Sequence, residues 1–376
     1  MSLNFASISN RSNFCAGNNF KKNNLKTIGF SGQELITPEV TQKLQLISDE
    51  INTANKIAVF THNNPDGDAA GSAAAMKNLI SSKYPDKKVD VFIMDAIPQG
   101  FKCLKDSESF EYINKKSNIE SIKARNYDLA ISVDCAEIDM MRDSSKIFDS
   151  AKRKVKIDHH SDGKDYADIN LTCGDASSAS QVVLLLADHM GVKLNKDLAS
   201  DIYLGLVTDT QGFRFMNKPV DVFEDASKLA KTNFDTRNVY ASSMDYMSKA
   251  AVKFYANVLN NIQYSKDGKI AYFIDDKTVN KKGIEKADVK DLFLKVVGQV
   301  MPNIEGVKVA VKIASNDSCT SGSLRGNGVA VNKLAEKLGG GGHEFAAGFG
   351  ITENAPPPEQ VLNQITDYFK KTGTLN

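Results

Sequence analysis

The stretch T-H-N-N-P-D-G-D-A-A-G-S, residues 61–72, decides how the first part of the chain is interpreted. It places His62, Asp66 and Asp68 within seven positions and then continues into the alanine-rich segment 69–81, which is predicted to be a helix. Two carboxylates one residue apart repel each other unless a positive charge lies between them, and a divalent metal would supply that charge. A polar turn with a helix N-cap is the alternative interpretation of the same residues.

Strand-like and helix-like runs alternate around this stretch. Strands are predicted at 57–60, 89–94, 127–133 and 154–157, and helices at 69–81, 178–190 and 198–207. This alternation is typical of βαβ units and predicts an α/β fold with a mostly parallel sheet covered by helices. Three of the strands end directly on His and Asp residues. Ligands of open α/β sheets bind outside the carboxyl ends of the strands, so we expect these segments to converge on one crevice.

Six side chains are candidates for metal ligands, and all are predicted at strand ends or in the turns that follow. They are His62, Asp66, Asp68, Asp134, His159 and Asp209. Carboxylates and imidazoles without cysteine favour a hard or borderline ion such as manganese over a structural zinc. Six protein ligands are more than one ion needs if water is also to bind. They suit two ions about 3.5–4 Å apart, bridged by a carboxylate.

The pattern changes after residue 235. The segment 235–261 contains no proline or glycine and is predicted to be a linking helix. Strands are then expected at 270–274 and 307–313, followed by a glycine-rich turn at 339–342 and an amphipathic helix at about 359–371. The predicted organisation is a catalytic domain at 37–235, a helical linker at 236–260 and a smaller α/β domain at 261–376.

Composition narrows the class of protein. The chain has 376 residues, 41% of them hydrophobic, and a net charge of +1. That balance disfavours binding to long duplex nucleic acid and favours a small substrate or one bound by its end. No apolar run approaches the roughly 18 residues of a membrane helix. Five cysteines without a C-x-x-C pair indicate reduced thiols in the cytoplasm.

The first 36 residues are predicted to be a disordered tail, because their first acid is Glu34 and they lack an apolar secretory core. A transit peptide is the alternative, since such peptides are poor in acids. Asparagine dominates this segment, however, and arginine does not.

The segments H-N-N-P-D-G-D-A-A-G-S, S-V-D-C, D-H-H and T-D-T-Q-G-F-R-F resemble the successive motifs of the DHH phosphoesterase superfamily. The later segment G-G-G-G-H-E-F-A-A-G-F resembles the signature of the associated DHHA1 domain. Together they span about residues 50 to 350, in the order and spacing of the family. The two-domain layout is similar to the nanoRNase / pAp phosphatase (bifunctional oligoribonuclease) branch.

The resemblance implies a role for each residue of the first domain. His62 and Asp66 would hold one manganese ion, with Asp68, His159 and Asp209 holding the other and Asp134 bridging the two. Mg²⁺ or Co²⁺ could substitute. His160 would face the scissile phosphate, and Asp158 would orient His159. The implied chemistry is two-metal activation of a bridging hydroxide that attacks phosphorus.

The second domain is expected to recognise the substrate. The expected contacts are Ser323, Arg325, Gly340, Gly341, Gly342, His343 and Arg214. Glycines let backbone N–H groups approach an anion, and Arg325 offers a planar fork for phosphate. Gly326 stands where the family pattern often has a serine. Arg214 has an alternative interpretation as a surface arginine paired with an acid.

The function that the resemblance implies is a manganese-dependent phosphohydrolase that degrades very short oligoribonucleotides and also dephosphorylates pAp. The alternatives are a phosphodiesterase of dinucleotide messengers such as pApA or cyclic di-AMP and, from another class, a catalytically inactive nucleotide-binding module. A homodimer is considered alongside a monomer.

Overall fold

The computed structural model describes residues 35–113, 116–275, 283–284, 289, 292–293, 295–316, 318–352 and 354–375. The expected tail, residues 1–36, therefore lies almost entirely outside the described residues. Within the described ranges, no helix has the length and apolar character that crossing a membrane requires.

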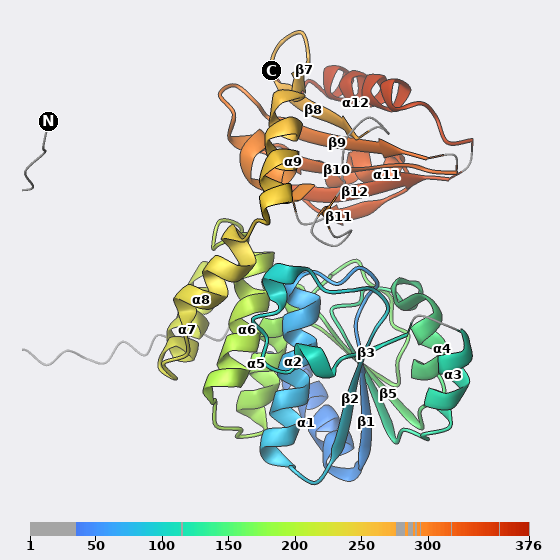
Figure 1. Ribbon diagram of the computed structural model, residues 1–376, viewed down its shortest axis with the longest axis vertical. Coiled ribbons are helices and arrows are strands. Elements are labelled where there is room, and N and C mark those ends of the chain that lie inside the picture. The colour runs from blue at the N-terminus through green and yellow to red at the C-terminus, as the bar shows by residue number, and fades with distance from the viewer. Residues whose placement is uncertain are drawn as a thin grey trace, which may run out of the picture. The chain divides into compact units, whose positions relative to one another are not determined.

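The first domain is built on a six-stranded parallel sheet (Figure 1), with the strand order β3-β2-β1-β4-β5-β6. Its strands are β1 (Lys56–Phe60), β2 (Lys88–Ile93), β3 (Glu111–Tyr112), β4 (Leu129–Val133), β5 (Arg153–Asp158) and β6 (Ile169–Thr172). The chain first builds outward from β1 to β3 and then returns to place β4 on the other side of β1. In an open sheet this reversal opens a crevice beyond the carboxyl ends of β1 and β4. The predicted α/β fold is confirmed.

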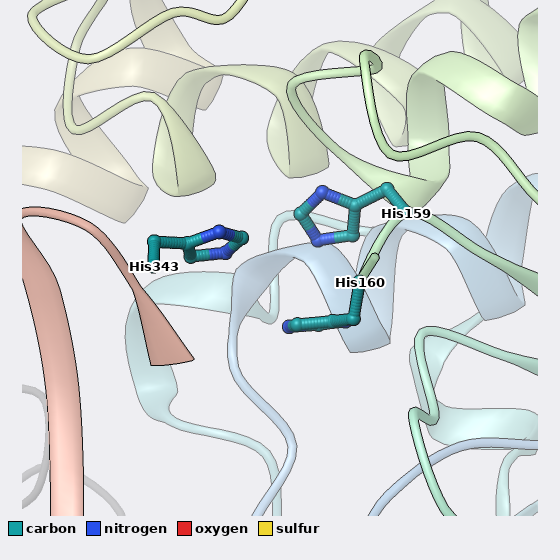
Figure 2. Close-up of side chains that lie close together, drawn as sticks. All are labelled: His159, His160 and His343. Atoms are coloured by element: carbon teal, nitrogen blue, oxygen red, sulfur yellow. The ribbon is translucent and has the colours of Figure 1, made fainter. Parts of the chain in front are cut away.

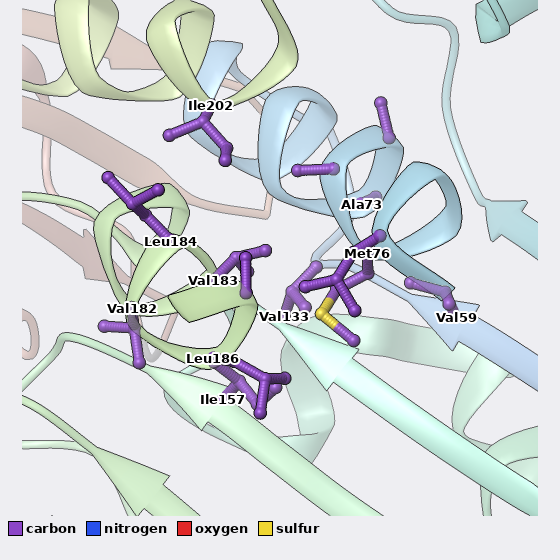
Figure 3. Close-up of a cluster of buried hydrophobic side chains, with 14 of the residues drawn as sticks. Val59, Ala73, Met76, Val133, Ile157, Val182, Val183, Leu184, Leu186 and Ile202 are labelled. Carbon is purple, nitrogen blue, oxygen red and sulfur yellow. The ribbon is translucent and has the colours of Figure 1, made fainter. Parts of the chain in front are cut away.

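Helices cover both faces of this sheet (Figure 1). One face carries α1 (Pro38–Thr53), α2 (Gly67–Lys83), α5 (Ala179–His189) and α6 (Lys196–Asp209), and the other carries α3 (Lys116–Lys123) and α4 (Ser145–Phe148). Alternate residues of β1 point to opposite faces, so Val59 joins the first core and Phe60 the second. Figure 3 shows Val59, Val133 and Ile157 facing the helices of the larger core.

Small residues let α2 and α6 pack closely. A Cβ at Gly71 would lie 2.7 Å from the Asp201 carbonyl oxygen, and one at Gly67 would collide with the Thr208 side chain. Residues 67–76 of α2 are all buried, which explains why this segment is rich in alanine instead of amphipathic. The close packing brings the N-terminal end of α2 beside the C-terminal end of α6, where Asp209 lies.

The segment predicted as one linking helix is divided in two. After α7 (Pro219–Ala230), α8 (Thr236–Tyr240) runs into a π-helical turn (Ala241–Asp245), and a separate helix, α9 (Lys249–Asn260), starts after Ser248. The Ser248 side chain accepts a hydrogen bond from the Ala251 amide and so forms the N-cap of α9. Val239 of α8 packs into the first domain and Phe254 of α9 into the second. The helix is interrupted because its first half packs on the core of the first domain and its second half on the core of the second domain.

The second domain is a mixed six-stranded sheet with the order β11-β12-β10-β9-β8-β7. Its strands are β7 (Gln263–Tyr264), β8 (Ile270–Asp275), β9 (Val309–Ser315), β10 (Thr320–Gly326), β11 (Gly341–His343) and β12 (Ala346–Ile351). The helices α11 (Asn332–Lys337) and α12 (Pro358–Thr372) pack on one face and α9 on the other. The predicted strands at 270–274 and 307–313 correspond to β8 and β9, and the predicted last helix to α12.

Candidate active site

The polar cluster lies at the carboxyl edge of the first sheet, beyond β1, β4 and β5. His62 comes two residues after β1, Asp134 directly after β4, and His159 directly after β5. The first two therefore lie at the point where the strand order reverses, which is where a doubly wound sheet places its ligands.

Asp134 lies at the centre of the cluster. Its Oδ2 is 3.5 Å from His62 Nε2, and its Oδ1 is 3.6 Å from His159 Nε2 and 3.7 Å from His160 Nδ1. The Oδ1 atom is buried and has no hydrogen-bond partner among the described residues. A buried carboxylate oxygen without a partner is costly, and a bound cation would supply the missing partner.

His62 and Asp66 lie on one side of Asp134. The Nδ1 atom of His62 is 2.8 Å from the carbonyl oxygen of Asn63, which leaves Nε2 facing the acids, and Asp66 Oδ1 is 3.8 Å away from it. Asp66 also accepts a hydrogen bond from the Ala69 amide as the N-cap of α2. The two interpretations of this motif are thus compatible, because the same carboxylate caps the helix and joins the cluster.

His159, Asp68 and Asp209 lie on the other side. His159 Nε2 is 3.5 Å from Asp209 Oδ2 and 3.9 Å from Asp68 Oδ2. Asp209 was expected at a strand end or in the turn after it, and this expectation is wrong, since it is the last residue of α6. Close packing of α6 on α2 brings it to the sheet edge.

Asp68 is held by the start of another helix. Its Oδ2 and Oδ1 atoms accept hydrogen bonds from the amides of Ala179 (2.6 Å) and Ser180 (2.9 Å), the first two residues of α5. Burial and the charges of Asp134 and Asp209 raise the pKa of Asp68. Desolvation also raises the pKa of Asp209. Uncompensated acids thus crowd this site.

The residues present fit metal ions. Two groups, one of His62, Asp66 and Asp134 and the other of Asp68, Asp134 and His159, each have ligand atoms within 4.8 Å of one another. Asp134 belongs to both groups. The donors are carboxylate oxygens and imidazole nitrogens, which divalent cations accept. The cluster could therefore hold a metal on either side of Asp134.

His160 lies beside this cluster and is held by Asp158. Its Nδ1 is 2.9 Å from Asp158 Oδ1, which also accepts a hydrogen bond from the His159 backbone amide. Burial opposes protonation of His160, but the hydrogen bond to Asp158 and the charge of Asp134 raise its pKa to about 10. We expected Asp158 to orient the ring of His159, and its carboxylate instead contacts the ring of His160. The Nδ1 of His159 faces the Ala176 carbonyl oxygen at 3.4 Å.

A third imidazole comes from the second domain. Figure 2 shows the rings of His159, His160 and His343 close together. The His343 ring centroid is 5.5 Å from that of His160, with nearly parallel planes, and 5.8 Å from that of His159. Burial, together with His159 and His160, lowers the pKa of His343. A largely neutral imidazole therefore faces the cluster from β11.

The glycines around His343 are required by close packing. A Cβ at Gly340 would collide with the Gly348 carbonyl oxygen, and Gly342 has a φ of +132° with the Ala346 carbonyl oxygen 2.8 Å from any Cβ. A Cβ at Gly341 would lie 3.7 Å from Asp162 Oδ2 of the first domain. The glycine run therefore lets β11 turn tightly beside the loop that carries His159 and His160.

Arg325 lines a cavity beside the cluster. The cavity has a volume of about 140 Å³ and is lined by Asp66, Gly67, Thr208, Asp209, Gln211, Ser243, Met244, Lys295, Gln299 and Arg325. The Nε atom of Arg325 is buried without a hydrogen-bond partner among the described residues. Burial lowers the pKa of Arg325, against the effect of Asp209. Ser323 lies two residues earlier on β10, on the same face of the strand.

Two families of known proteins match this chain. The model of the DHH family, N-terminal domain, matches residues 56–206, and the model of the DHHA1 domain matches residues 290–372. The protein MG371 of Mycoplasma genitalium is 30% identical over 315 residues, which cover 83% of this chain and 91% of that protein. The chain belongs to the DHH phosphoesterase family.

Other DHH relatives agree with this assignment. The bifunctional oligoribonuclease and PAP phosphatase NrnA of Bacillus subtilis is 28% identical over 305 residues, which cover 80% of this chain and 91% of that protein. The crystal structure of an exopolyphosphatase-related protein from Bacteroides fragilis has a TM-score of 0.73 at 24% identity, and the match covers 88% of this chain and 96% of that one. The latter similarity shows a common fold.

The surroundings of the polar cluster include side chains and backbone amides that were not predicted from the sequence. The amides of Ala179 and Ser180 hold Asp68, Gln211 lines the cavity, and Lys156 is buried behind Asp158. Lys156 lies two residues before Asp158 in the run R-K-V-K-I-D, where its alternation with Val155 and Ile157 is typical of a solvent-facing lysine, so its burial leaves no signal in the sequence. Arg214 is exposed on the turn after α6, and the contacts described for it are those of its backbone.

Proposed function

We propose that this chain is a manganese-dependent phosphohydrolase that releases nucleotides from very short oligoribonucleotides and removes the 3′-phosphate of pAp. The observation that carries the proposal is Asp134, whose buried Oδ1 has no hydrogen-bond partner among the described residues and which belongs to two groups of side chains that could hold a metal ion. The NrnA proteins among the relatives are named for these two activities, and that supports the choice of substrates.

In this proposal, His62 and Asp66 would hold one cation, and Asp68, His159 and Asp209 would hold the other, with Asp134 available to both sets of ligands. Bound divalent cations would activate water for attack on phosphorus and offset the charge that develops on the phosphoryl oxygens. Oxygen and imidazole donors without a thiolate suit manganese. The amides of α5 keep Asp68 in place, and the Asn63 carbonyl oxygen holds His62 with Nε2 facing the acids.

His160 acts on the reacting phosphate. Its Nδ1 is occupied by Asp158, so Nε2 remains available to donate a hydrogen bond to a phosphoryl oxygen or a proton to the leaving oxygen. The raised pKa of His160 keeps a proton on the ring near neutral pH. A protonated imidazole at this position offsets negative charge where it develops.

The second domain binds the rest of the substrate. Arg325 offers a guanidinium with an unpartnered Nε, and His343 faces His160 across the site. The cavity beside Asp209 has a volume of about 140 Å³ and is lined in part by Arg325, so it suits a phosphate or a sugar. Limited room beside the reacting centre supports the choice of a very short substrate.

A substrate panel tests this proposal. Hydrolysis of pAp, pApA, a five-residue RNA, cyclic di-AMP and pyrophosphate is measured with Mn²⁺ and again with a chelator. We expect the highest kcat/KM for pApA, the five-residue RNA and pAp, with loss of product in the chelator. Preference for cyclic di-AMP would favour a messenger phosphodiesterase. A complete lack of Mn²⁺-dependent turnover, with substrate still bound, would favour an inactive nucleotide-binding module.

A further inference from the structure

A lysine is fully buried directly behind the candidate active site. Lys156 lies in β5 with no exposed surface, and so does Asp158 two residues later on the same face of the strand. Burying an ammonium group is costly unless all its donors find partners. The groups that surround the Lys156 ammonium therefore indicate what this buried charge does.

Three oxygens surround the Lys156 ammonium. Its Nζ donates to the carbonyl oxygens of Ala136 and Lys164, each at 3.0 Å, and lies 3.3 Å from Asp158 Oδ2. The ring of Tyr166 lies on another side, with its centroid 5.3 Å from Nζ. The two carbonyl oxygens accept hydrogen bonds from two of its three donors, and Asp158 Oδ2, which has no hydrogen-bond partner among the described residues, forms an ion pair with it.

These oxygens come from the two loops that carry the site. Ala136 follows Asp134 by two residues, while Lys164 lies in the loop that begins at His159 and runs to β6. Space for this contact comes from Gly163, where a Cβ would lie 2.8 Å from Lys156 Nζ. One buried ammonium thus ties the loop after β4 to the loop after β5.

The same ammonium faces the carboxylate that holds His160. Asp158 uses Oδ1 for His160 Nδ1 and the His159 amide, and Oδ2 faces Lys156. A carboxylate paired in this way stays charged and fixed, so it accepts the Nδ1–H hydrogen bond and leaves His160 Nε2 directed to the substrate.

We propose that Lys156 is a positioning residue of the phosphohydrolase, which orients His160 through Asp158. The role in turnover rests on the proposed function, whereas the effect on His160 does not. Lys156 touches no reacting group itself. Its contribution reaches the phosphate only through the orientation of the His160 ring.

The variant Lys156→Met tests this, because methionine fills most of the same space without charge. The matched control is Lys154→Met, the same change two residues earlier on β5, where the lysine is partly exposed and its Nζ lies 4.0 Å from Asp168. We expect kcat on the best substrate of the panel to fall about 10–100-fold in Lys156→Met, the usual effect of losing such a supporting group, with KM changed less than about threefold. The control should keep wild-type kcat.

A double-mutant cycle separates positioning from stability. In a His160→Ala background, Lys156→Met should cost less than about threefold in kcat, because the imidazole that it positions is gone. An equal loss in both backgrounds would show that Lys156 acts only through the fold, and the proposal would be wrong. Unchanged kcat in a folded Lys156→Met protein would also overturn it.

A spectroscopic measurement tests the same contact without turnover. In metal-free protein, the ¹⁵N and ¹H shifts of His160 Nδ1–H should change in Lys156→Met and stay constant in Lys154→Met. If Lys156→Met does not fold, Lys156→Gln serves instead, because its amide keeps two N–H donors for the carbonyl oxygens of Ala136 and Lys164 and loses the charge that faces Asp158. Should no substrate of the panel be hydrolysed by wild-type protein, the proposed function fails, and the shifts still decide whether Lys156 positions His160.

Discussion

At the scale of single residues, the backbone of Asp134 is unusual. Its φ is +53°, a left-handed conformation that costs a residue other than glycine about 1 kcal/mol or more. Such strain persists only where the surroundings enforce it. Here the left-handed turn directly after β4 brings the carboxylate back between His62 and His159. The strained conformation therefore serves the geometry of the cluster.

Asp134→Asn should separate folding from metal binding. It keeps the shape of the side chain and removes one of the charges that raise the pKa of Asp68, so we expect the protein to stay folded in chelator. Stabilisation by added Mn²⁺ and hydrolysis should both be lost. Denaturant unfolding with and without Mn²⁺ measures this, with Asp139→Asn, an exposed acid five residues on, as control. Undiminished Mn²⁺ stabilisation in Asp134→Asn would contradict the central position of this carboxylate.

At the scale of elements, the contact of α5 with α6 places Asp68. A Cβ at Gly205 of α6 would collide with Ser180 Oγ and Asp68 Oδ1. The absence of a side chain at this position lets the N-terminal end of α5 reach the carboxylate and donate its first amides to it. The small size of Gly205 is thus needed both for the packing of α5 on α6 and for the position of Asp68.

Gly205→Ala should therefore weaken the packing of α5 on α6 and displace Asp68. We expect a loss of about 1–3 kcal/mol in the free energy of unfolding, the usual effect of an extra methyl in a packed core, and a weaker Mn²⁺-induced shift in Tm. Urea unfolding and thermal scans measure the two effects. Gly350→Ala is the matched control, because a Cβ there meets no atom within 4 Å. Equal behaviour of the two variants would refute this account of the packing.

A buried acid between α2 and α6 should make stability depend on pH. Burial raises the pKa of Asp201 to about 8, although Asn78 donates a hydrogen bond to its carboxylate. The folded chain then keeps a proton that the unfolded chain has lost, so stability should fall by about 1.4 kcal/mol per pH unit between roughly pH 4 and pH 8. Urea unfolding from pH 6.5 to 8 should show a smaller slope in Asp201→Asn. Asp139→Asn, which changes an exposed acid that is not among the charges acting on Asp201, should keep the wild-type slope.

At the scale of the whole molecule, the proposed function gives the two domains separate tasks. The six metal ligands of the proposed function belong to the first domain, whereas Arg325 and His343 belong to the second. The divided linker follows this separation, since α8 packs on the first core and α9 on the second. Substitutions in the second domain should therefore affect substrate binding without affecting the metals.

Arg325→Met tests this division of tasks. Loss of the guanidinium should raise KM for pApA about tenfold or more, because one charge-assisted contact to phosphate is removed, and should leave the Mn²⁺-induced shift in Tm unchanged. Steady-state kinetics and thermal scans measure the two effects. Lys308→Met, which removes an exposed cation from the same domain, should change neither. A reduced Mn²⁺ shift in Arg325→Met would mean that the second domain helps to hold the metals.

Much of the site follows from sequence alone. The ends of 57–60, 127–133 and 154–157 carry His62, Asp134 and His159, and parallel strands must bring their carboxyl ends to one edge. The predicted α/β fold and family are confirmed for the same reason, because motif order and strand alternation are local properties. Strands β10, β11 and β12 were not predicted, because glycines occupy several of their positions and the sequence there does not alternate between apolar and polar side chains.

Only the tertiary structure decided which side chains touch. Asp209 reaches the cluster from the end of α6 because α6 packs on α2. The linker is divided because its first half packs on the core of the first domain and its second half on the core of the second. Asp158 contacts His160 because a buried Lys156 faces its other oxygen. Each of these depends on contacts between residues far apart in the chain, and burial and charge at such contacts are properties of the folded molecule that no local pattern of residues encodes.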